Sequence, residues 1–407
     1  MPKLRYGRPL WLQRAATPRR RFSLQRGTLT VDIAIVGGGI TGAIAAYLFS
    51  EAGVSVAVLE ARRVARGSTA ASTALLMQEP DKDFSELAER YGKRAARSIW
   101  LALKSATHEL SKTIRRLQIQ CDLRERDSIY FTLKPQNVEQ LRDEFHHRRG
   151  AGLPGRWLSR RRLHRIAGIR GEGGILTPGN AEIDPVKACL GFLRAARSRG
   201  AQIFESSPVR RTTATRTGVS LRTAHGVVHA KQVLVATGYA TREFKPLVGR
   251  FKMKDTYVLA TRRLPEPMRR QLLRRNTMLW DTDRPYHYFR WTMDGRLLVG
   301  GEDIDHRSRR NSAKQLAAGR ARLLAYLADV YPALRSERPD YSWEGLFAET
   351  PDGLPYIGVH RRYPQHLFAL GYGGNGMTAS FLAAKLLLAR YRKRPMPEES
   401  LFSFSRS

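Results

Sequence analysis

Two short apolar runs near the start of the chain have the pattern of buried parallel strands joined by a helix. Val31 to Val36 is rich in β-branched residues, and residues 39–52 repeat apolar side chains at helical spacing up to Gly53. Val54 to Leu59 is a second apolar run, which ends at an acid, Glu60. The pattern predicts a β-α-β unit with the acid at the carboxyl end of its second strand.

Further along, helical and strand-like patterns alternate. After about Asp255 the sequence predicts mainly strands, which are rich in aromatic residues. Helices are predicted for residues 84–118 (one or two), 137–149, 185–199, 315–331 and 377–391, and strands for 128–133, 201–205, 227–237 and 367–370. Residues 286–299 read as a hairpin that turns at Asp294-Gly295. Asp184-Pro185 has the composition of a helix start, with an N-cap acid before a proline.

These elements predict an α/β (mixed α+β) fold: a Rossmann-like βαβ nucleotide-binding domain interleaved with an antiparallel-sheet substrate domain. The nucleotide-binding domain is expected to take residues 28–90, 175–250 and 341–407. The substrate domain is expected to take residues 91–174 and 251–340, and residues 1–27 to form a basic flexible extension.

The chain of 407 residues is strongly basic, with 71 Lys and Arg against 36 Asp and Glu, a formal charge of +35. Such a field attracts polyanions and anionic membranes, so nucleic acid or a membrane surface is a possible partner. The basic residues are spread along the whole chain, which favours solvated basic faces over one binding stripe.

The segment Pro18 to Leu24 resembles a twin-arginine signal, but the apolar stretch after it carries the glycines of a nucleotide-binding turn. No other segment has the pattern of a membrane span. Two cysteines, Cys121 and Cys189, are too few for a disulfide framework or a cysteine-rich metal site. We therefore expect a cytoplasmic protein without a metal site.

Gly37, Gly39 and Gly42 form G-x-G-x-x-G between the first strand and its helix, which is the context that a dinucleotide site requires. A pyrophosphate would lie on the helix N-terminus, and Glu60 would accept hydrogen bonds from ribose hydroxyls. The acid disfavours a ribose 2′-phosphate, so NAD and FAD remain. The hydroxyl-rich stretch Ala65 to Leu76 could wrap a pyrophosphate and pass beneath a flavin.

The same spacing recurs at Gly371, Gly373 and Gly376, only about thirty residues before the chain ends. Too little chain follows its helix for a second strand and acid, so a second dinucleotide site is not expected. A helix N-terminus carries roughly half a positive charge, which would stabilise a reduced flavin. We therefore expect one cofactor, held at both ends by glycine loops far apart in sequence.

Several segments together resemble the D-amino-acid-oxidase-like FAD-dependent oxidoreductases, which include glycine, sarcosine and γ-glutamylputrescine oxidases. They are DIAIVGGGITGAIAAYLFSEAGVSVAVLEA, RGSTAAST, DPVKACLGFLRAARSRGAQIFESSPV, VLVATGY, YHYFRWTMDGRLLVGGED, WEGLFAETPDGLPYIG and GYGGNGMTAS, in family order from about Val31 to Tyr391. The resemblance implies FAD as the cofactor. Relatives that attach flavin covalently use a cysteine near Leu346 to Glu349, where this chain has none, so the resemblance implies non-covalent FAD.

The resemblance also implies roles for individual positions. The FAD-binding positions would be Gly37, Gly39, Gly42, Glu60, Ser68, Thr69, Ser72, Thr73, Val209, Thr237, Gly238, Gly373, Gly374, Asn375, Gly376, Met377 and Thr378. Many relatives carry an Arg-Asn pair where this chain has Ala71-Ser72, so the contacts to the flavin itself are expected to differ.

The reaction that the resemblance implies is oxidation of a small-molecule amine or amino acid, with hydride passing to flavin N5 and the imine then hydrolysing. O2 or another acceptor would take the electrons, and Lys252 and Lys254 are candidate cations near N5. Two alternatives remain open: a flavoenzyme that modifies nucleic acid such as tRNA, and a membrane-surface dehydrogenase that reduces quinone.

Four side chains are candidates for the catalytic site: Tyr257, His287, Arg290 and Tyr372. Arg290 has the geometry to pair with a substrate carboxylate in two hydrogen bonds. Strand alternation places Arg290 on the face of Tyr286 and Tyr288, and His287 on the opposite face. These candidates therefore cannot all point at one flavin.

Overall fold

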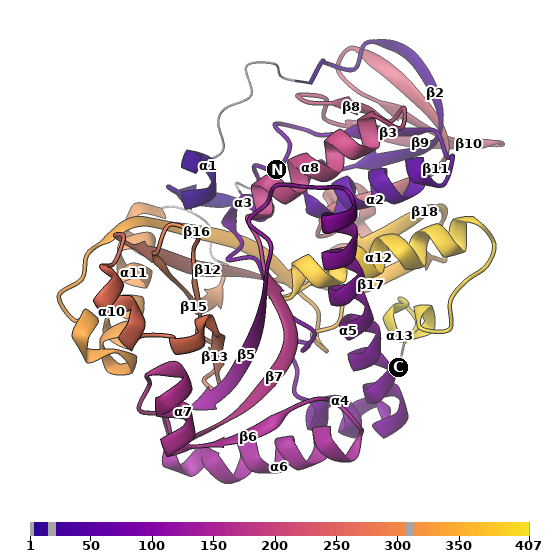
Figure 1. Cartoon of the computed structure of the whole chain (residues 1–407). Coiled ribbons are helices and arrows are strands. Elements are labelled where there is room, and N and C mark those ends of the chain that lie inside the picture. The colour runs from indigo at the N-terminus through magenta and orange to yellow at the C-terminus, as the bar shows by residue number, and fades with distance from the viewer. Residues whose placement is uncertain (1–3, 15–21, 307–311, 407) are drawn as a thin grey trace.

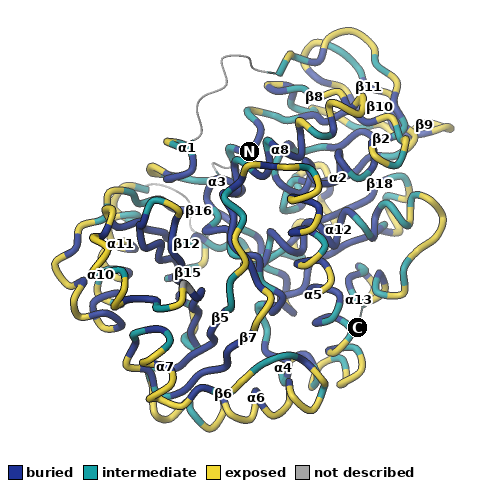
Figure 2. Tube along the Cα trace, viewed as in Figure 1, coloured by how far each residue is buried: buried dark blue, intermediate teal, exposed yellow. Residues whose placement is uncertain are grey.

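The computed structural model describes residues 4–14, 22–306 and 312–406, whose strands form two sheets that lie side by side (Figure 1). Helices occur between the strands of both sheets along the chain, which confirms the mixed α/β fold class. The strands are mostly buried, and exposed residues concentrate in the outer helices and turns (Figure 2). In the described part of the chain, no helix is both long and apolar enough to cross a membrane.

The smaller sheet is the nucleotide-binding sheet, and its central strands are parallel. Its order is β17 (Tyr356–His360), β18 (Tyr363–Leu370), β11 (Gly226–Gly238), β2 (Gly27–Val36), β3 (Val56–Leu59) and β8 (Gln202–Phe204), with β10 (Gly218–Arg222) and β9 (Arg211–Thr215) beyond one end of β11. Alternation along β2 buries Ile33 and Ile35 in one core and Ala34 in another. Both faces of this sheet are therefore covered, as a parallel sheet requires.

Helices from distant parts of the chain pack on the Ile33 face. They are α2 (Ile40–Glu51), α5 (Lys93–Arg116), α8 (Pro185–Arg197) and α12 (Gly376–Tyr391). The predicted N-cap of α8 is confirmed, because Asp184 Oδ1 accepts from the N–H groups of Val186 and Lys187, both at 3.0 Å. The sheet is therefore assembled from three separate visits of the chain.

The larger sheet has ten strands within the described residues. Its order is β1 (Arg5–Gly7), β16 (Pro339–Glu349), β12 (Lys252–Thr261), β15 (Leu297–Asp305), β14 (Tyr288–Trp291), β13 (Met278–Asp281), β5 (Arg124–Thr132), β7 (Gly173–Glu182) and β4 (Leu75–Leu76), with β6 (Arg156–Ser159) paired to β7. Its pairs are antiparallel except β13 with β5. The remaining helices are α1 (Leu10–Arg14), α3 (Ser68–Ala71), α4 (Phe84–Tyr91), α6 (Val138–Gly150), α7 (Arg160–Ala167), α9 (Lys245–Val248), α10 (Glu266–Gln271), α11 (Ser312–Val330) and α13 (Glu399–Phe402).

The divisions between the two sheets differ from the expected domain boundaries. The expected boundaries at residues 175 and 341 fall inside β7 and β16, and both strands belong to the larger sheet. Helix α5, expected in the substrate domain, buries Leu103 and Leu110 in the core shared with α2 and α12. The boundaries differ because the long elements β7, β16 and α5 do not end where the sequence pattern divides the two domains.

The expectation of a flexible extension at residues 1–27 is wrong for residues 5–14. Strand β1 pairs with β16, and Trp11 of α1 is only 1% exposed. This short basic segment is held because Leu10 and Trp11 are buried in a hydrophobic core and β1 pairs with β16. Residues 1–3 and 15–21 lie outside the described residues, and residues 27–36 are already part of β2.

Candidate functional site

A cavity of about 620 Å³ lies where the carboxyl ends of β2, β11 and β18 approach the larger sheet. It is lined on one side by both glycine loops and on the other by aromatic and acidic side chains of the larger sheet. Because β11 pairs in parallel with both β2 and β18, the loops after these strands open toward the same place. This is the position at which open α/β sheets bind their ligands.

The first glycine loop is tightly built and leaves little room for side chains. Gly37 has a φ of 115°, and a Cβ on Gly42 would lie 1.9 Å from the Gly37 carbonyl oxygen. Glu60 follows β3 and accepts hydrogen bonds from the N–H groups of Gly38 and Arg62, both at 2.8 Å. Burial raises the pKa of Glu60 above its ordinary value, against the effect of those two hydrogen bonds.

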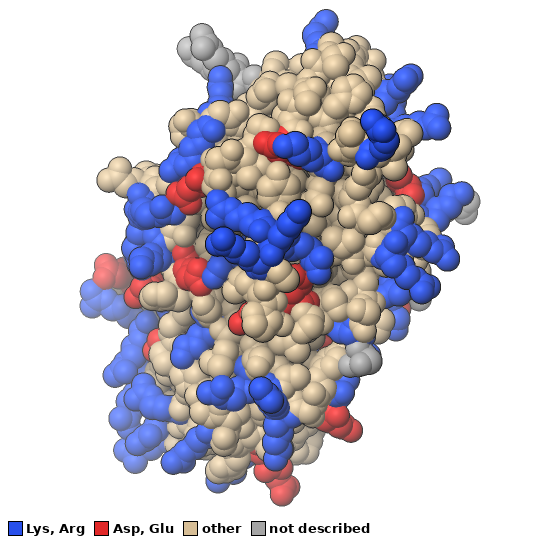
Figure 3. All heavy atoms as spheres, turned by 90° about the vertical axis from the view of Figure 1, so that its right-hand side faces the viewer, with Lys and Arg blue, Asp and Glu red and all other residues tan. Residues whose placement is uncertain are grey.

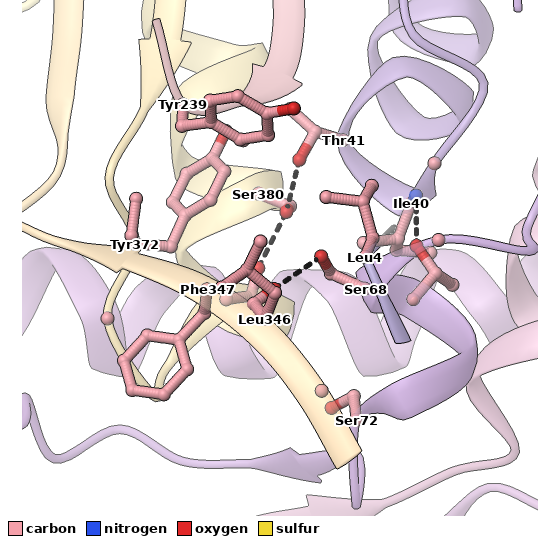
Figure 4. Close-up of a pocket in the computed structure, with 18 of the residues that line it drawn as sticks. Leu4, Ile40, Thr41, Ser68, Ser72, Tyr239, Leu346, Phe347, Tyr372 and Ser380 are labelled. Carbon is pink, nitrogen blue, oxygen red and sulfur yellow. Dashed lines mark hydrogen bonds between the residues drawn. The ribbon is translucent and has the colours of Figure 1, made fainter. Parts of the chain in front are cut away.

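The second glycine loop carries the N-terminus of α12 to the N-terminus of α2. Thr41 Oγ1 and Ser380 Oγ are 2.7 Å apart and join the two helices near their N-termini (Figure 4). The Asn375 side-chain amide donates to the carbonyls of Met77 and Glu79 at 3.1 and 2.9 Å, which fixes the loop against the larger sheet. Two helix N-termini, each with a partial positive charge, therefore face one cavity.

The hydroxyl-rich loop at residues 65–76 lines the cavity between the first glycine loop and strand β16. The Ser68 hydroxyl donates to the carbonyl of Leu346 at 2.9 Å, and the Thr69 hydroxyl accepts from the Ile40 N–H at 3.0 Å (Figure 4). Arg63 and Arg66 also line this part of the cavity. Their charges, which the sequence analysis did not single out, suit a diphosphate at this point.

Comparison with known proteins agrees with this geometry. The model of a family described as DAO: FAD dependent oxidoreductase matches residues 32–390. The chain belongs to this family. It is an FAD-dependent oxidoreductase with the mixed α/β fold expected from the sequence.

Two curated relatives and one solved structure show the extent of the likeness. The γ-glutamylputrescine oxidoreductase of Escherichia coli (strain K12) is 28% identical over 371 residues, which cover 90% of this chain and 84% of that protein. The glycine oxidase of Bacillus licheniformis is 26% identical over 92% of this chain and 96% of its own length. The crystal structure of glycine oxidase from Geobacillus kaustophilus superposes with a TM-score of 0.80 at 23% identity, covering 93% of this chain and 99% of that one.

Most positions expected to bind FAD lie in the wall of the cavity. All of the cofactor positions expected from the sequence line the cavity except Gly42 and Thr378. Gly42 lies behind the loop, where it permits the close approach of α2 to Gly37. Thr378 is fully buried in α12, with its hydroxyl 3.3 Å from that of Thr107. The N-termini of α2 and α12, neither of which has a side-chain cap, lie next to each other and face the cavity.

Of the four catalytic candidates, Tyr372 lines the cavity, whereas Tyr257, His287 and Arg290 do not. The Arg290 guanidinium is buried and donates to the carbonyls of Ala74 and Ile183 at 2.8 and 3.0 Å. Arg290 is two residues beyond the cavity-lining Tyr288 in β14 and shares its face of the sheet, but Arg290 itself does not line the cavity. Its expected pairing with a substrate carboxylate is therefore not supported by its position.

His287 and Tyr257 lie behind the cavity wall. His287 Nδ1 is 2.8 Å from Asp281 and Nε2 is 3.1 Å from Glu302, while Tyr326 stacks on the ring at 3.6 Å. Burial opposes protonation of His287, yet the two carboxylates outweigh it and raise its pKa. Asp283 also brings a ligand atom within 4.8 Å of Asp281 and His287, but those two residues already bond to each other. Tyr257 packs beneath α11.

The sequence analysis missed three carboxylates that line the substrate side: Asp81, Asp303 and Glu349. Burial raises the pKa of Asp81 to about 7, helped by Glu349 and Asp303 and opposed by the Gly374 N–H, which donates to Asp81 Oδ2 at 2.5 Å. Burial raises the pKa of Asp303 to about 6, with Thr256 opposing and Glu349 adding to the rise. The three acids therefore act on one another across a shared space.

A β-bulge places Asp303 in the cavity wall. Tyr257 pairs with Gly301 and Asp255 with Ile304, so Glu302 and Asp303 stand together opposite one residue of β12. Gly301 has a φ of 142° and Glu302 a φ of 59°. The paired glycines of GGED, residues 300–303, are a weak sequence signal of such a bulge. The alternation of side chains along a regular strand does not predict the direction of Asp303.

Cationic side chains on the substrate side have acidic partners. Lys254 Nζ is 2.6 Å from Asp305, Lys82 is 3.3 Å from Glu86, and Arg284 is 3.6 Å from Asp83. Lys252, the other expected cation near the flavin, is exposed and does not line the cavity. Aromatic side chains complete this wall, where Arg284 stacks on Tyr286 at 3.9 Å and Trp280 packs against the edge of the same ring.

Replacing Gly42 by alanine tests the first glycine loop. The added Cβ would overlap the Gly37 carbonyl, so α2 must move and the loop must open. We expect a loss of unfolding free energy of about 1–3 kcal/mol, typical of overpacking, together with FAD content far below that of the wild type. Absorbance of the purified protein and denaturant unfolding measure both.

The matched control is Gly150→Ala in α6, where an added Cβ meets nothing within 4 Å. It should retain FAD and keep or slightly raise its stability, since alanine favours a helix more than glycine. Equal FAD content in the Gly42→Ala and Gly150→Ala proteins would contradict the proposed role of the loop.

Proposed function

We propose that this flavoenzyme oxidises a cationic amine, with the carbon next to nitrogen giving a hydride to FAD. The observation that carries the proposal is the single cavity that joins both glycine loops to a wall of carboxylates and aromatic rings. FAD, when bound, supplies the hydride acceptor. The names of the relatives, γ-glutamylputrescine oxidoreductase and glycine oxidase, support an amine or an amino acid as the substrate class.

The wall of the larger sheet would bind and orient the amine. Asp81, Asp303 and Glu349 attract an ammonium group, and the rings of Tyr286 and Tyr288 exclude water from it. Hydride leaves most readily from a neutral amine, so the ammonium proton must go to an acceptor. Carboxylates whose pKa values lie near 6 and 7 are suited to take it.

The same wall disfavours an α-amino acid. A substrate carboxylate needs an uncommitted cation, and Lys82, Lys254 and Arg284 each have an acidic partner. Arg290 donates to backbone carbonyls outside the cavity. A monoamine or diamine therefore fits the described lining better than a zwitterion.

The FAD would be held without a covalent bond by the cavity-lining positions expected from the sequence. Both cysteines are free and buried and lie outside the described lining of the cavity, so neither is placed to attach a flavin. Burial raises the pKa of Cys189 far above its ordinary value, which keeps its thiol unreactive. Free thiols also accord with the cytoplasmic location expected from the sequence.

The electron acceptor would be O2 or another small oxidant reaching the reduced flavin. Lys254 is the one expected cation that lines the cavity, although its ammonium group is held by Asp305. The names of the matching family and of these relatives point to neither alternative function, on nucleic acid or at a membrane. On the face drawn in Figure 3, basic side chains lie in scattered groups with acids between them.

Anaerobic titration tests the proposed function. Aliphatic monoamines and diamines should bleach the yellow protein, and α-amino acids should do so weakly or not at all. Bleaching by amino acids alone would refute the cationic-amine class while leaving amine oxidation intact. No bleaching by any amine or amino acid would refute the function itself. Rapid recolouring in air would identify an oxidase, and slow recolouring a dehydrogenase.

Replacing Asp303 by asparagine removes one carboxylate from the wall and keeps its size. We expect kcat/KM for a cationic amine to fall about 10- to 100-fold, since a buried charge pair contributes on the order of 1.5–3 kcal/mol. FAD content should remain that of the wild type. Asp329→Asn on the exposed face of α11 is the control and should change neither quantity. A fall of less than twofold would exclude Asp303 from substrate binding.

The pH dependence of cation binding provides a further test. Below pH 6 both Asp81 and Asp303 are mostly protonated, because their pKa values are raised to about 7 and about 6. Affinity for tetramethylammonium, whose charge does not titrate, should therefore rise as the pH increases from 5.5 to 8, by about fivefold or more. Flavin absorbance changes report the binding. An affinity independent of pH would contradict the role of the acids, and Asp303→Asn should flatten the rise.

A further inference from the structure

Residues 4–14 form a strap that crosses the outside of the hydroxyl-rich loop. Strand β1 pairs with β16 from Arg5 opposite Gly345 to Gly7 opposite Trp343. The Leu4 carbonyl accepts from the Leu346 N–H at 3.0 Å, and the Leu4 side chain itself lines the cavity (Figure 4). Leu4 also covers Gly67, where a Cβ would lie 2.8 Å from the Leu4 Cδ1 atom. The strap is therefore part of the cavity wall through Leu4.

Two side chains of the strap bind backbone carbonyls at the two ends of the loop. Arg5 Nε donates to the Arg66 carbonyl at 2.8 Å, and Trp11 Nε1 donates to the Ser72 carbonyl at 2.8 Å. Arg66 and Ser72 both line the cavity. A carbonyl oxygen that accepts a hydrogen bond from the strap is directed away from the cavity. If the same oxygen pointed into the cavity, its partial negative charge would repel a diphosphate. The strap thus favours a loop conformation that leaves donors facing the ligand.

The far end of the strap is anchored independently. Leu10 and Trp11 are each 1% exposed, the Arg290 guanidinium lies 5.3 Å from the Trp11 ring, and Arg14 forms an ion pair with Asp294. This explains the position of Arg290: it supports the strap and the end of the loop by its bond to the Ala74 carbonyl. Anchors on both sides of the loop allow the strap to hold it closed.

We infer that residues 4–14 are a cofactor-retaining strap, which slows the release of FAD by fixing the loop at residues 66–72 over its diphosphate. Leu4 blocks the exit by occupying the wall, and Arg5 and Trp11 hold the loop in its binding conformation. The inference concerns the cofactor alone and does not depend on which substrate is oxidised.

The test compares FAD release from the full-length holoprotein and its variants. Arg5→Met and Trp11→Phe each remove a donor and preserve most of the packing, and the double variant removes both ties. Free-flavin fluorescence after dilution reports the release rate. We expect each single variant to release FAD about 3- to 10-fold faster, as for the loss of one hydrogen bond, and the double variant at least tenfold faster. Trp157→Phe in β6, outside the described lining of the cavity, is the control.

Thermal unfolding separates cofactor retention from a merely structural role. The double variant should lose more stability in its FAD-loaded form than in its apo form, because only the loaded form contains the ligand that the strap holds. Release rates within twofold of the wild type would overturn the inference. So would an equal loss of stability in both forms, which would make the strap a structural element only. Leu4→Gly, at the end of the strap, provides a second variant if the double variant fails to fold.

Discussion

The parallel pairing of β11 with β2 on one side and β18 on the other is the constraint on which the cofactor site depends. Since all three strands run in one direction, α2 and α12 begin at the same edge of the sheet. The 2.7 Å contact of Thr41 with Ser380 joins these helices where each has free N–H groups. Parallel neighbours cannot be joined by a tight turn, so the chain between them builds the larger sheet. The substrate wall is thus made from the connections that the cofactor sheet requires.

The charge of the whole chain and the charge of its cavity have opposite signs on the substrate side. The whole chain has a formal net charge of +35, but exposed charges are screened within about 10 Å at ordinary salt. Asp81 and Asp303 are only partly exposed in the cavity wall, and burial raises the pKa of each. The acids that line the cavity therefore set the local charge there, whereas the net charge of the chain governs the outer surface.

Local signals made much of the fold and the cofactor site predictable, while the substrate wall depended on geometry that local patterns do not contain. The glycine spacing at Gly37 and Gly373 marks each loop by itself, and apolar periodicity marks the strands and helices around it. Alternation gives the face on which Arg290 lies but not its distance along the strand from the cavity. The arginines of the strap indicate solvent exposure, so the sequence does not predict its packing, although Leu10 and Trp11 are apolar signals within it.

The bulge in β15 connects two neighbouring residues: Glu302, which forms ion pairs behind the cavity, and Asp303, which lines the cavity. Glu302 adopts a left-handed φ of 59°, which costs a non-glycine residue about 1 kcal/mol or more. The Glu302 carboxylate lies 3.1 Å from His287 and 2.5 Å from Arg322, and these two contacts offset that cost. If Glu302 relaxed to an extended conformation, the next residue, Asp303, would turn away from the space that Thr256 faces. His287 therefore acts on the cavity without lining it: its contact with Glu302 supports the backbone that directs the Asp303 carboxylate into the cavity.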